Sequence, residues 1–188
     1  SGAAIIGHIL IDKGYRVGII SQPDMKTGDD IKRLGEPLLF WGVTSGCVDS
    51  MVSNYTALKK FRSDDDLTPG GVNDRRPDRA LIAYTGLIRR FFKDTVPIVL
   101  GGIEASLRRI AHYDYWQDKI RPSVLLDSKA EILVYGMGER TIAEVMRRIK
   151  EKHSLAGIPG TARLLGKKES DAFIPSEQYI ELPSFDEV

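Results

Sequence analysis

The sequence predicts an α/β fold with a parallel sheet and helices on both faces. Short apolar runs without polar alternation are typical of strands buried on both faces, and they recur along the chain. Segments with apolar residues at helical spacing separate these runs, and glycine or small polar residues follow each run. We therefore expect a Rossmann-like sheet of the flavodoxin type, with its strand-to-helix loops gathered along one edge.

The first elements are expected to be a helix ending at Gly14 and a strand at 16–20. A helix that leads into a parallel strand normally follows another strand of the same sheet. We therefore expect that the first strand of the sheet is missing from this chain.

The middle of the chain continues the alternation. The expected strands are 38–43, 98–100 and 132–135. The expected helices are 47–60, 77–92, 107–110, 123–127 and 139–152. A long polar loop with acidic and basic runs is expected at 61–77, and such loops are uncommon unless they are functional or mobile.

The division into domains follows from where this pattern weakens. Residues 1–153 are expected to form the α/β domain, and 154–188 to form a tail or linker toward a further domain. Within this tail, 162–165 is a candidate short strand.

The loops after the predicted strands form the first candidate site. Glycine lets a backbone approach a ligand closely, and the helices that follow offer free N–H groups. We expect a crevice for a small molecule or a second domain, bordered by Gln22, Asp24, Thr44, Ser45, Gly101, Gly102, Glu104, Gly136, Gly138 and Glu139. Tight turns of this kind also occur in this fold without any ligand, so a purely structural role is the alternative.

The segment 99–116 carries the second candidate site. It combines a buried strand and a glycine turn with an unusual concentration of polar and aromatic residues. Its Arg108, His112, Tyr113, Asp114 and Trp116 are interpreted as a substrate-binding or inter-domain surface. A catalytic histidine–aspartate pair requires a geometry that sequence does not show, so no catalytic residue is assigned.

Composition excludes several classes of protein. The net charge is +1, so no overall field recruits nucleic acid or an acidic membrane. Cys47 is the single cysteine, which excludes an intrachain disulfide and a multi-cysteine metal site and favours a cytoplasmic location. There is no apolar run of about 20 residues, no GxGxxG fingerprint and no P-loop, and no signal peptide is visible in these residues.

Five stretches resemble a known family. They are GVTSGCVDSMVSNYTALKK (42–60), TPGG (68–71), RPDRA (76–80), VLGGIEASLRRIAHYDYW (99–116) and SVLLDSKAEILVYGMGER (123–140). Together they are similar to the N-terminal part of the YgiQ-type (UPF0313) radical SAM proteins. The resemblance implies a longer parent protein whose radical SAM barrel binds a [4Fe-4S] cluster and S-adenosylmethionine.

Two departures limit what the resemblance implies for this chain. No CxxxCxxC motif is present, so we expect no cofactor in this fragment and no radical chemistry from it alone. The Gly101-Gly102 turn and the GMGE at 136–139 are similar to the cobalamin-binding domains that precede many radical SAM barrels. The DxHxxG loop of those domains is absent, so we expect a cobalamin-binding-like fold without cobalamin.

The expected function is that of an N-terminal accessory domain of a radical SAM enzyme with an unknown substrate. Its expected partners are its own radical SAM domain and that substrate, with no membrane and no strong nucleic-acid signal. The alternative is a cobalamin-binding or nucleotide-binding sensor module without catalysis.

Overall fold

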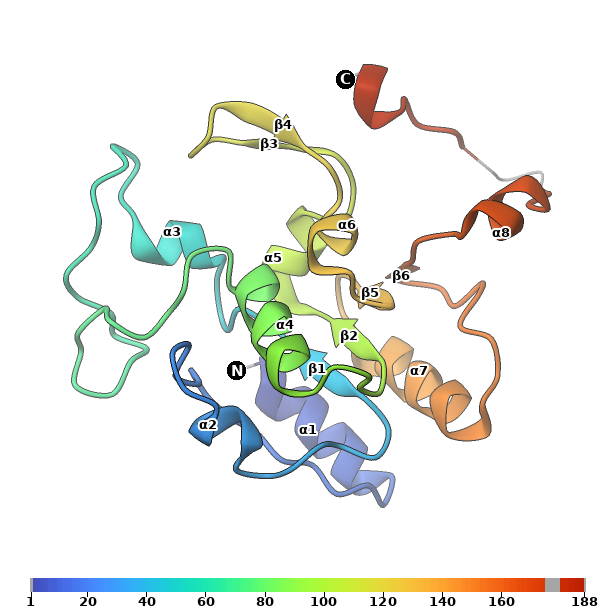
Figure 1. Ribbon diagram of the computed structural model, residues 1–188, viewed down its shortest axis with the longest axis horizontal. Coiled ribbons are helices and arrows are strands. Elements are labelled where there is room, and N and C mark those ends of the chain that lie inside the picture. Colours follow the sequence, from blue (N-terminus) through green and yellow to red (C-terminus); the bar gives the residue numbers. More distant parts are fainter. Residues whose placement is uncertain (1, 175–179, 188) are drawn as a thin grey trace.

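The centre of the molecule is a four-stranded sheet with the order β1-β2-β5-β6 (Figure 1). β1 (Trp41–Val43), β2 (Ile98–Leu100) and β5 (Ile132–Val134) are parallel. β6 (Thr161–Ala162) pairs with β5 in the antiparallel direction. The predicted α/β fold with a parallel sheet is confirmed. β6 overlaps the candidate strand at 162–165, but its antiparallel pairing with β5 was not predicted.

The structure, a computed structural model, describes residues 2–174 and 180–187. Its helices are α1 (Gly2–Asp12), α2 (Asp29–Lys32), α3 (Ser50–Asn54), α4 (Ala80–Phe91), α5 (Gly102–Leu107), α6 (Val124–Ser128), α7 (Glu139–Glu151), α8 (Lys167–Asp171) and the 3-10 turn η1 (Phe185–Glu187). A separate hairpin consists of β3 (His112–Asp114) and β4 (Lys119–Arg121).

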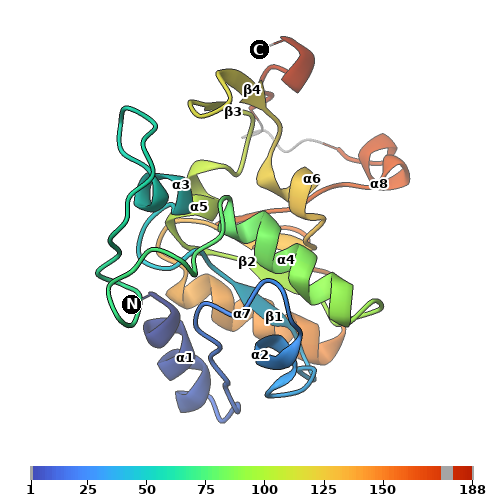
Figure 2. The same ribbon diagram turned by 60° about the vertical axis from the view of Figure 1, so that its left-hand side comes forward.

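Helices cover both faces of the sheet, as predicted. α1 packs against α7 on one face, whereas α4 contacts α2 and α6 on the other (Figures 1 and 2). The strands read as continuous apolar runs because both of their faces are buried. In β2, Ile98 and Leu100 belong to the core cluster beneath α4, while Val99 belongs to the cluster beneath α7.

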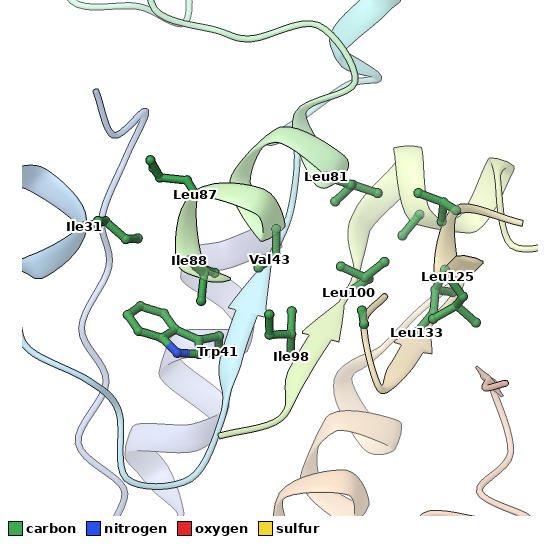
Figure 3. Packing of buried hydrophobic residues seen from close by; sticks show 13 residues of the cluster. Ile31, Trp41, Val43, Leu81, Leu87, Ile88, Ile98, Leu100, Leu125 and Leu133 are labelled. Carbon is green, nitrogen blue, oxygen red and sulfur yellow. The ribbon is translucent and has the colours of Figure 1, made fainter. Parts of the chain in front are cut away.

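The larger core cluster lies between the sheet and α4 (Figure 3). Leu81 and Ile88 of α4 point toward Ile98 and Leu100 of β2, and all four are almost completely buried. This packing fixes the strands, and therefore the loops that leave their carboxyl ends.

The strand predicted at 16–20 is wrong. These residues run without ladder hydrogen bonds and are not part of the sheet, in which β1 is an edge strand. A β-strand exists only where a neighbouring strand pairs with it. An apolar run such as Gly18-Ile19-Ile20 therefore predicts an extended conformation, but it does not show that a neighbouring strand is available to pair with it.

The helix predicted at 47–60 is also wrong over most of its length, because only α3 is helical. The backbone of Tyr55 is extended and forms an isolated bridge with Phe61. The carbonyl of Asn54 accepts a hydrogen bond from the amide of Arg62 at 2.8 Å. These contacts with the following loop replace helical hydrogen bonds despite the favourable apolar spacing.

The helix predicted at 107–110 begins and ends earlier than expected, as α5. The chain then turns away, and residues 112–121 form the β3–β4 hairpin, which was not predicted. The predicted helices at 77–92 and 123–127 correspond to α4 and α6, and the predicted strand at 132–135 corresponds to β5.

The expected tail begins with residues that pack on the sheet. Ile158 is buried in the cluster beneath α7, and β6 extends the sheet. Residues 175–179 and 188 of the expected tail lie outside the described residues. The position of the domain boundary stays a prediction. Among the residues that the structure describes, no helix combines the length and apolar character that crossing a membrane requires.

We expect Gly102→Ala to destabilise the fold by about 1–3 kcal/mol, because Gly102 has a φ of +88° and a Cβ there would lie 2.5 Å from Oγ1 of Thr44. Gly86→Ala within α4 is the matched control, since a Cβ at Gly86 would meet nothing within 4 Å. Urea denaturation of both variants measures the difference. Equal stabilities would contradict a tight turn at Gly102.

Candidate functional site

The loops after β1, β2 and β5 meet at one edge of the sheet, as the sequence predicts. The amide of Gly101 donates to the carbonyl of Val43 at 2.9 Å, and the amide of Gly136 donates to Oγ of Ser106 at 3.1 Å. We call the carboxyl ends of these three strands the sheet edge. It includes Thr44, Gly101, Gly102, Gly136 and Gly138. Glu139 follows it as the first residue of α7.

Two predicted crevice residues have their contacts elsewhere. Nε2 of Gln22 donates to Oγ1 of Thr68 at 2.7 Å, so Gln22 contacts the long loop at 61–77. Asp24 accepts hydrogen bonds from the amide of Lys26 and the hydroxyl of Thr27. Because the segment before these residues is not a strand of the sheet, its end is not directed to the sheet edge.

Glu104 is completely buried and is bound by backbone groups. One carboxylate oxygen accepts the amide of Ser50 at 2.8 Å, and the other accepts the amide of Leu81 at 3.3 Å. These amides belong to the first turns of α3 and α4, whose N–H groups lack partners within their helices. Glu104 therefore joins the beginnings of two helices. Ser45 is likewise buried, and its hydroxyl donates to the carbonyl of Val48.

Asp114 anchors the β3–β4 hairpin to the domain. Its Oδ2 accepts hydrogen bonds from Nη2 of Arg79 at 2.8 Å and from Nε at 3.2 Å. Its Oδ1 accepts the amides of Trp116 and Gln117, which shapes the turn of the hairpin. Burial alone would raise the pKa of Asp114, but the hydrogen bonds from Arg79 and from the amide of Gln117 outweigh burial and lower it.

A second arginine–carboxylate pair joins α3 to the end of α5. Arg108 binds Oδ2 of Asp49 through Nη2 at 2.7 Å and Nε at 3.1 Å. Oδ1 of Asp49 accepts the amides of Met51 and Val52 and so caps α3. The side chains of Arg108 and Asp49 are only 12% and 6% exposed, so neither charge is screened well by water.

A cavity of about 510 Å³ lies between α3, the end of α5 and the hairpin. We call it the aromatic pocket; it is lined by Asp49, Val52, Tyr55, Thr56, Ala57, Arg62, Leu107, Arg108, His112, Tyr113, Asp114, Tyr115 and Trp116. Its lining includes all the residues predicted as a substrate or inter-domain surface. Its volume lies within the range of about 300–1,000 Å³ that is usual for small-molecule sites.

Aromatic rings form much of the lining. The ring of Trp116 lies 5.2 Å from that of Tyr55 and 5.3 Å from that of Tyr115, measured between centroids. The hydroxyl of Tyr115 donates to the carbonyl of Ala57, and that of Tyr55 donates to Asp78. Because these hydroxyls are bound by the protein, the orientation of both rings is fixed.

Sequence reasoning missed Tyr55 and Tyr115 as pocket residues. Tyr55 falls within the helix predicted at 47–60, but α3 ends before it and its backbone is extended. Tyr115 lies between Asp114 and Trp116 in the segment 99–116, so its predicted neighbours mark its position. Arg62, which belongs to the long loop, carried no signal of its own.

His112 lies between the aromatic pocket and a smaller cavity of about 10 Å³. Its Nδ1 lies 3.2 Å from the carbonyl of Ile110, which can only accept, so Nδ1 is the donor and Nε2 the acceptor. Nε2 is buried and has no hydrogen-bond partner among the described residues. Burial lowers the pKa of His112. The smaller cavity has room for about one water molecule, which would donate to Nε2.

The chain does not supply the ligands of an iron–sulfur cluster. Cys47 is its single cysteine, and it is exposed. Within the described ranges, no three His, Cys, Asp or Glu side chains gather in a way that could hold a metal ion.

Comparison with known proteins identifies the family. The family model of the radical SAM N-terminal domain matches residues 1–188. The chain belongs to the radical SAM N-terminal family. It is 55% identical over 190 residues to a UPF0313 protein of Thermotoga maritima and 50% identical over 188 residues to one of Fusobacterium nucleatum. This confirms the resemblance to the UPF0313 proteins.

The matched proteins are much longer than this chain. Both alignments cover the whole of this chain, which spans only 32% of the length of each relative. A UPF0313 protein of Pseudomonas syringae is 57% identical over 157 residues, which is 84% of this chain and 20% of that protein.

One solved structure shares the fold. It is the radical S-adenosylmethionine methyltransferase TsrM from Kitasatospora setae, determined with tryptophan substrate and a SAM analogue bound. The TM-score is 0.56 at 22% sequence identity, and the match covers 86% of this chain and 25% of that one. At this identity the match supports the fold of the radical SAM N-terminal domain and nothing beyond it.

Glu104→Gln should destabilise the domain by about 1–3 kcal/mol. The side-chain amide has only one oxygen, so one of the two backbone N–H groups of Ser50 and Leu81 would face the NH₂ group and lose its acceptor. Glu139→Gln serves as the control, because Glu139 is only partly buried at the start of α7. Denaturant midpoints measure both. A Glu104→Gln variant as stable as the control would show that the buried carboxylate is dispensable.

The Arg79–Asp114 pair should make the free energy of unfolding of the domain decrease at acidic pH. The pKa of Asp114 is lowered from 3.8 in the folded state, so its stabilising contribution is complete above about pH 3.8 and is lost as the pH falls through the folded pKa. Thermal unfolding between pH 2 and 6 measures this loss. In Asp114→Asn the acid-dependent loss should be smaller than in the unmodified chain, and an unchanged pH profile would contradict the assignment.

Proposed function

We propose that this chain is the N-terminal accessory domain of a radical SAM enzyme that depends on a [4Fe-4S] cluster. The domain contributes substrate and inter-domain contacts and leaves the radical chemistry to the remainder of the protein. Membership in the family and the length of the relatives support this assignment. The cluster and S-adenosylmethionine are bound, in this proposal, by the part of the protein beyond this chain.

The exposed apolar side chains around the sheet edge carry the proposal. Met137, between Gly136 and Gly138, is 86% exposed, and Leu107 and Ile103 of α5 are 62% and 49% exposed. Apolar residues grouped in this way usually mark an interaction surface. We infer that this edge packs against the radical SAM domain. The aromatic pocket, which Leu107 at the end of α5 helps to line, then faces the substrate.

Met137→Asp in the full-length protein should weaken packing between the two domains, because a carboxylate would be buried without a partner. Hydrogen exchange at 101–107 and 136–138 should rise, whereas the exchange of the core strands should not. Leu38→Asp is a matched control. Leu38 is 85% exposed and lies just before the amino-terminal end of β1, whereas the sheet edge lies at the carboxyl ends of the strands.

The same preparations test the enzyme assignment. After anaerobic reconstitution with iron and sulfide and subsequent reduction, we expect the full-length protein to cleave S-adenosylmethionine to 5′-deoxyadenosine. Absence of cleavage would overturn the radical SAM assignment. Equal exchange in Met137→Asp and Leu38→Asp would overturn the placement of the interface at the sheet edge.

A further inference from the structure

The ring faces in the aromatic pocket form a surface on which a flat molecule can stack. Trp116 and Tyr115 project from the hairpin, and Tyr55 lies where the chain leaves α3. Tyr115 is 46% exposed, and Tyr55 and Trp116 are partly exposed. Exposed aromatic rings held in fixed orientations lose little entropy when a planar ring stacks on them.

Charges of both signs surround the pocket. Asp78 and Asp118 accept the hydroxyls of Tyr55 and Tyr113, and Lys59 and Arg62 are the cations that can bind an anionic ligand. The two carboxylates in its lining, Asp49 and Asp114, are each bound by an arginine, so they contribute no free negative charge. Nζ of Lys59 lies 4.7 Å from the centroid of the Tyr115 ring, at the rim of the pocket. Nζ of Lys59 donates to the carbonyl of Trp116 at 3.5 Å, and Nε of Arg62 donates to the carbonyl of Tyr55 at 3.1 Å. Neither side chain forms an ion pair with a described carboxylate, so their charges remain able to bind an anion.

We propose that the aromatic pocket binds a nucleotide, either free or within a single strand of RNA. The base stacks on Trp116 and Tyr55, and Lys59 and Arg62 bind the phosphate. Stacking on aromatic rings beside basic side chains is how proteins hold unpaired nucleotides with little preference for the base. The near-zero net charge of the chain does not oppose this, because the two cations are local to the pocket.

The inference deepens the proposed function, since it names the substrate class for the surface assigned there. The idea that the bound nucleotide is a substrate of radical chemistry rests on the proposed function. Nucleotide binding is nevertheless measured independently of S-adenosylmethionine cleavage, so the two can fail separately.

The test is a titration of the full-length protein with each of the four ribonucleoside monophosphates and with a single-stranded 12-nucleotide RNA of mixed sequence. Stacking on Trp116 should quench tryptophan fluorescence. Trp116→Ala should weaken binding about tenfold or more and remove the quench. Lys59→Ala should weaken binding severalfold and make it less dependent on salt.

Lys32→Ala is the matched control for Lys59→Ala. Nζ of Lys32 lies 4.6 Å from the centroid of the Phe91 ring, an equivalent contact away from the pocket. The control should bind as the unmodified protein does. Circular dichroism and the denaturation midpoint of each variant separate lost binding from lost folding, and Lys59→Ala removes only an exposed side chain.

The outcomes separate the sources of the ligand. Comparable binding of a monophosphate and of the RNA supports a free nucleotide, while binding of the RNA alone supports a single strand. No binding of either at millimolar ligand, or binding that Trp116→Ala and Lys59→Ala leave unchanged, overturns the proposal. In that case intact cleavage of S-adenosylmethionine would leave the proposed function standing.

Discussion

Glu104 links the beginnings of α3 and α4, and the arrangement of the functional end of the molecule depends on that link. A carboxylate taken out of water must have its oxygens satisfied, and here the amides of Ser50 and Leu81 do so. The partial positive charge at each helix beginning favours the same arrangement. Because Glu104 lies on α5, directly after the glycine turn that ends β2, it fixes both helices relative to the sheet.

The two arginine–carboxylate pairs extend this rigidity to the aromatic pocket. Arg108 and Asp49 fasten α3 to the end of α5, and Arg79 and Asp114 fasten the hairpin to the beginning of α4. Each pair is bidentate on the arginine side, which fixes orientation as well as distance. The pocket walls therefore come from segments far apart in the sequence that are tied together by buried charges.

Sequence alone predicted the sheet, because Ile98-Val99-Leu100 and Ile132-Leu133-Val134 read plainly as strands buried on both faces. It failed at 47–60, where the hydrogen bond between the carbonyl of Asn54 and the amide of Arg62 in the following loop replaced a helical one. It failed at 16–20 because a segment becomes a strand only where a neighbouring strand pairs with it, and the sequence of the segment does not show whether one does. The glycine-rich loops were predicted to meet, and they do meet at the sheet edge.

The candidate site was less accessible to prediction for the same reason. The residues of 108–116 could be singled out from their composition, but their partners could not. The hairpin that presents Trp116 depends on Arg79, and no local pattern connects these two positions. In the same way, the sequence marked Glu104 as a crevice residue but gave no indication that its carboxylate is bound internally.

The buried pairs have a consequence for how this domain changes over evolutionary time. Replacing Asp114 alone would leave the guanidinium of Arg79 without its partner, and replacing Arg79 alone would leave a carboxylate that is wholly shielded from water. A single change is therefore costlier than a concerted one. Homologues should carry both members of a pair or neither, so that positions 79 and 114, and likewise 49 and 108, covary.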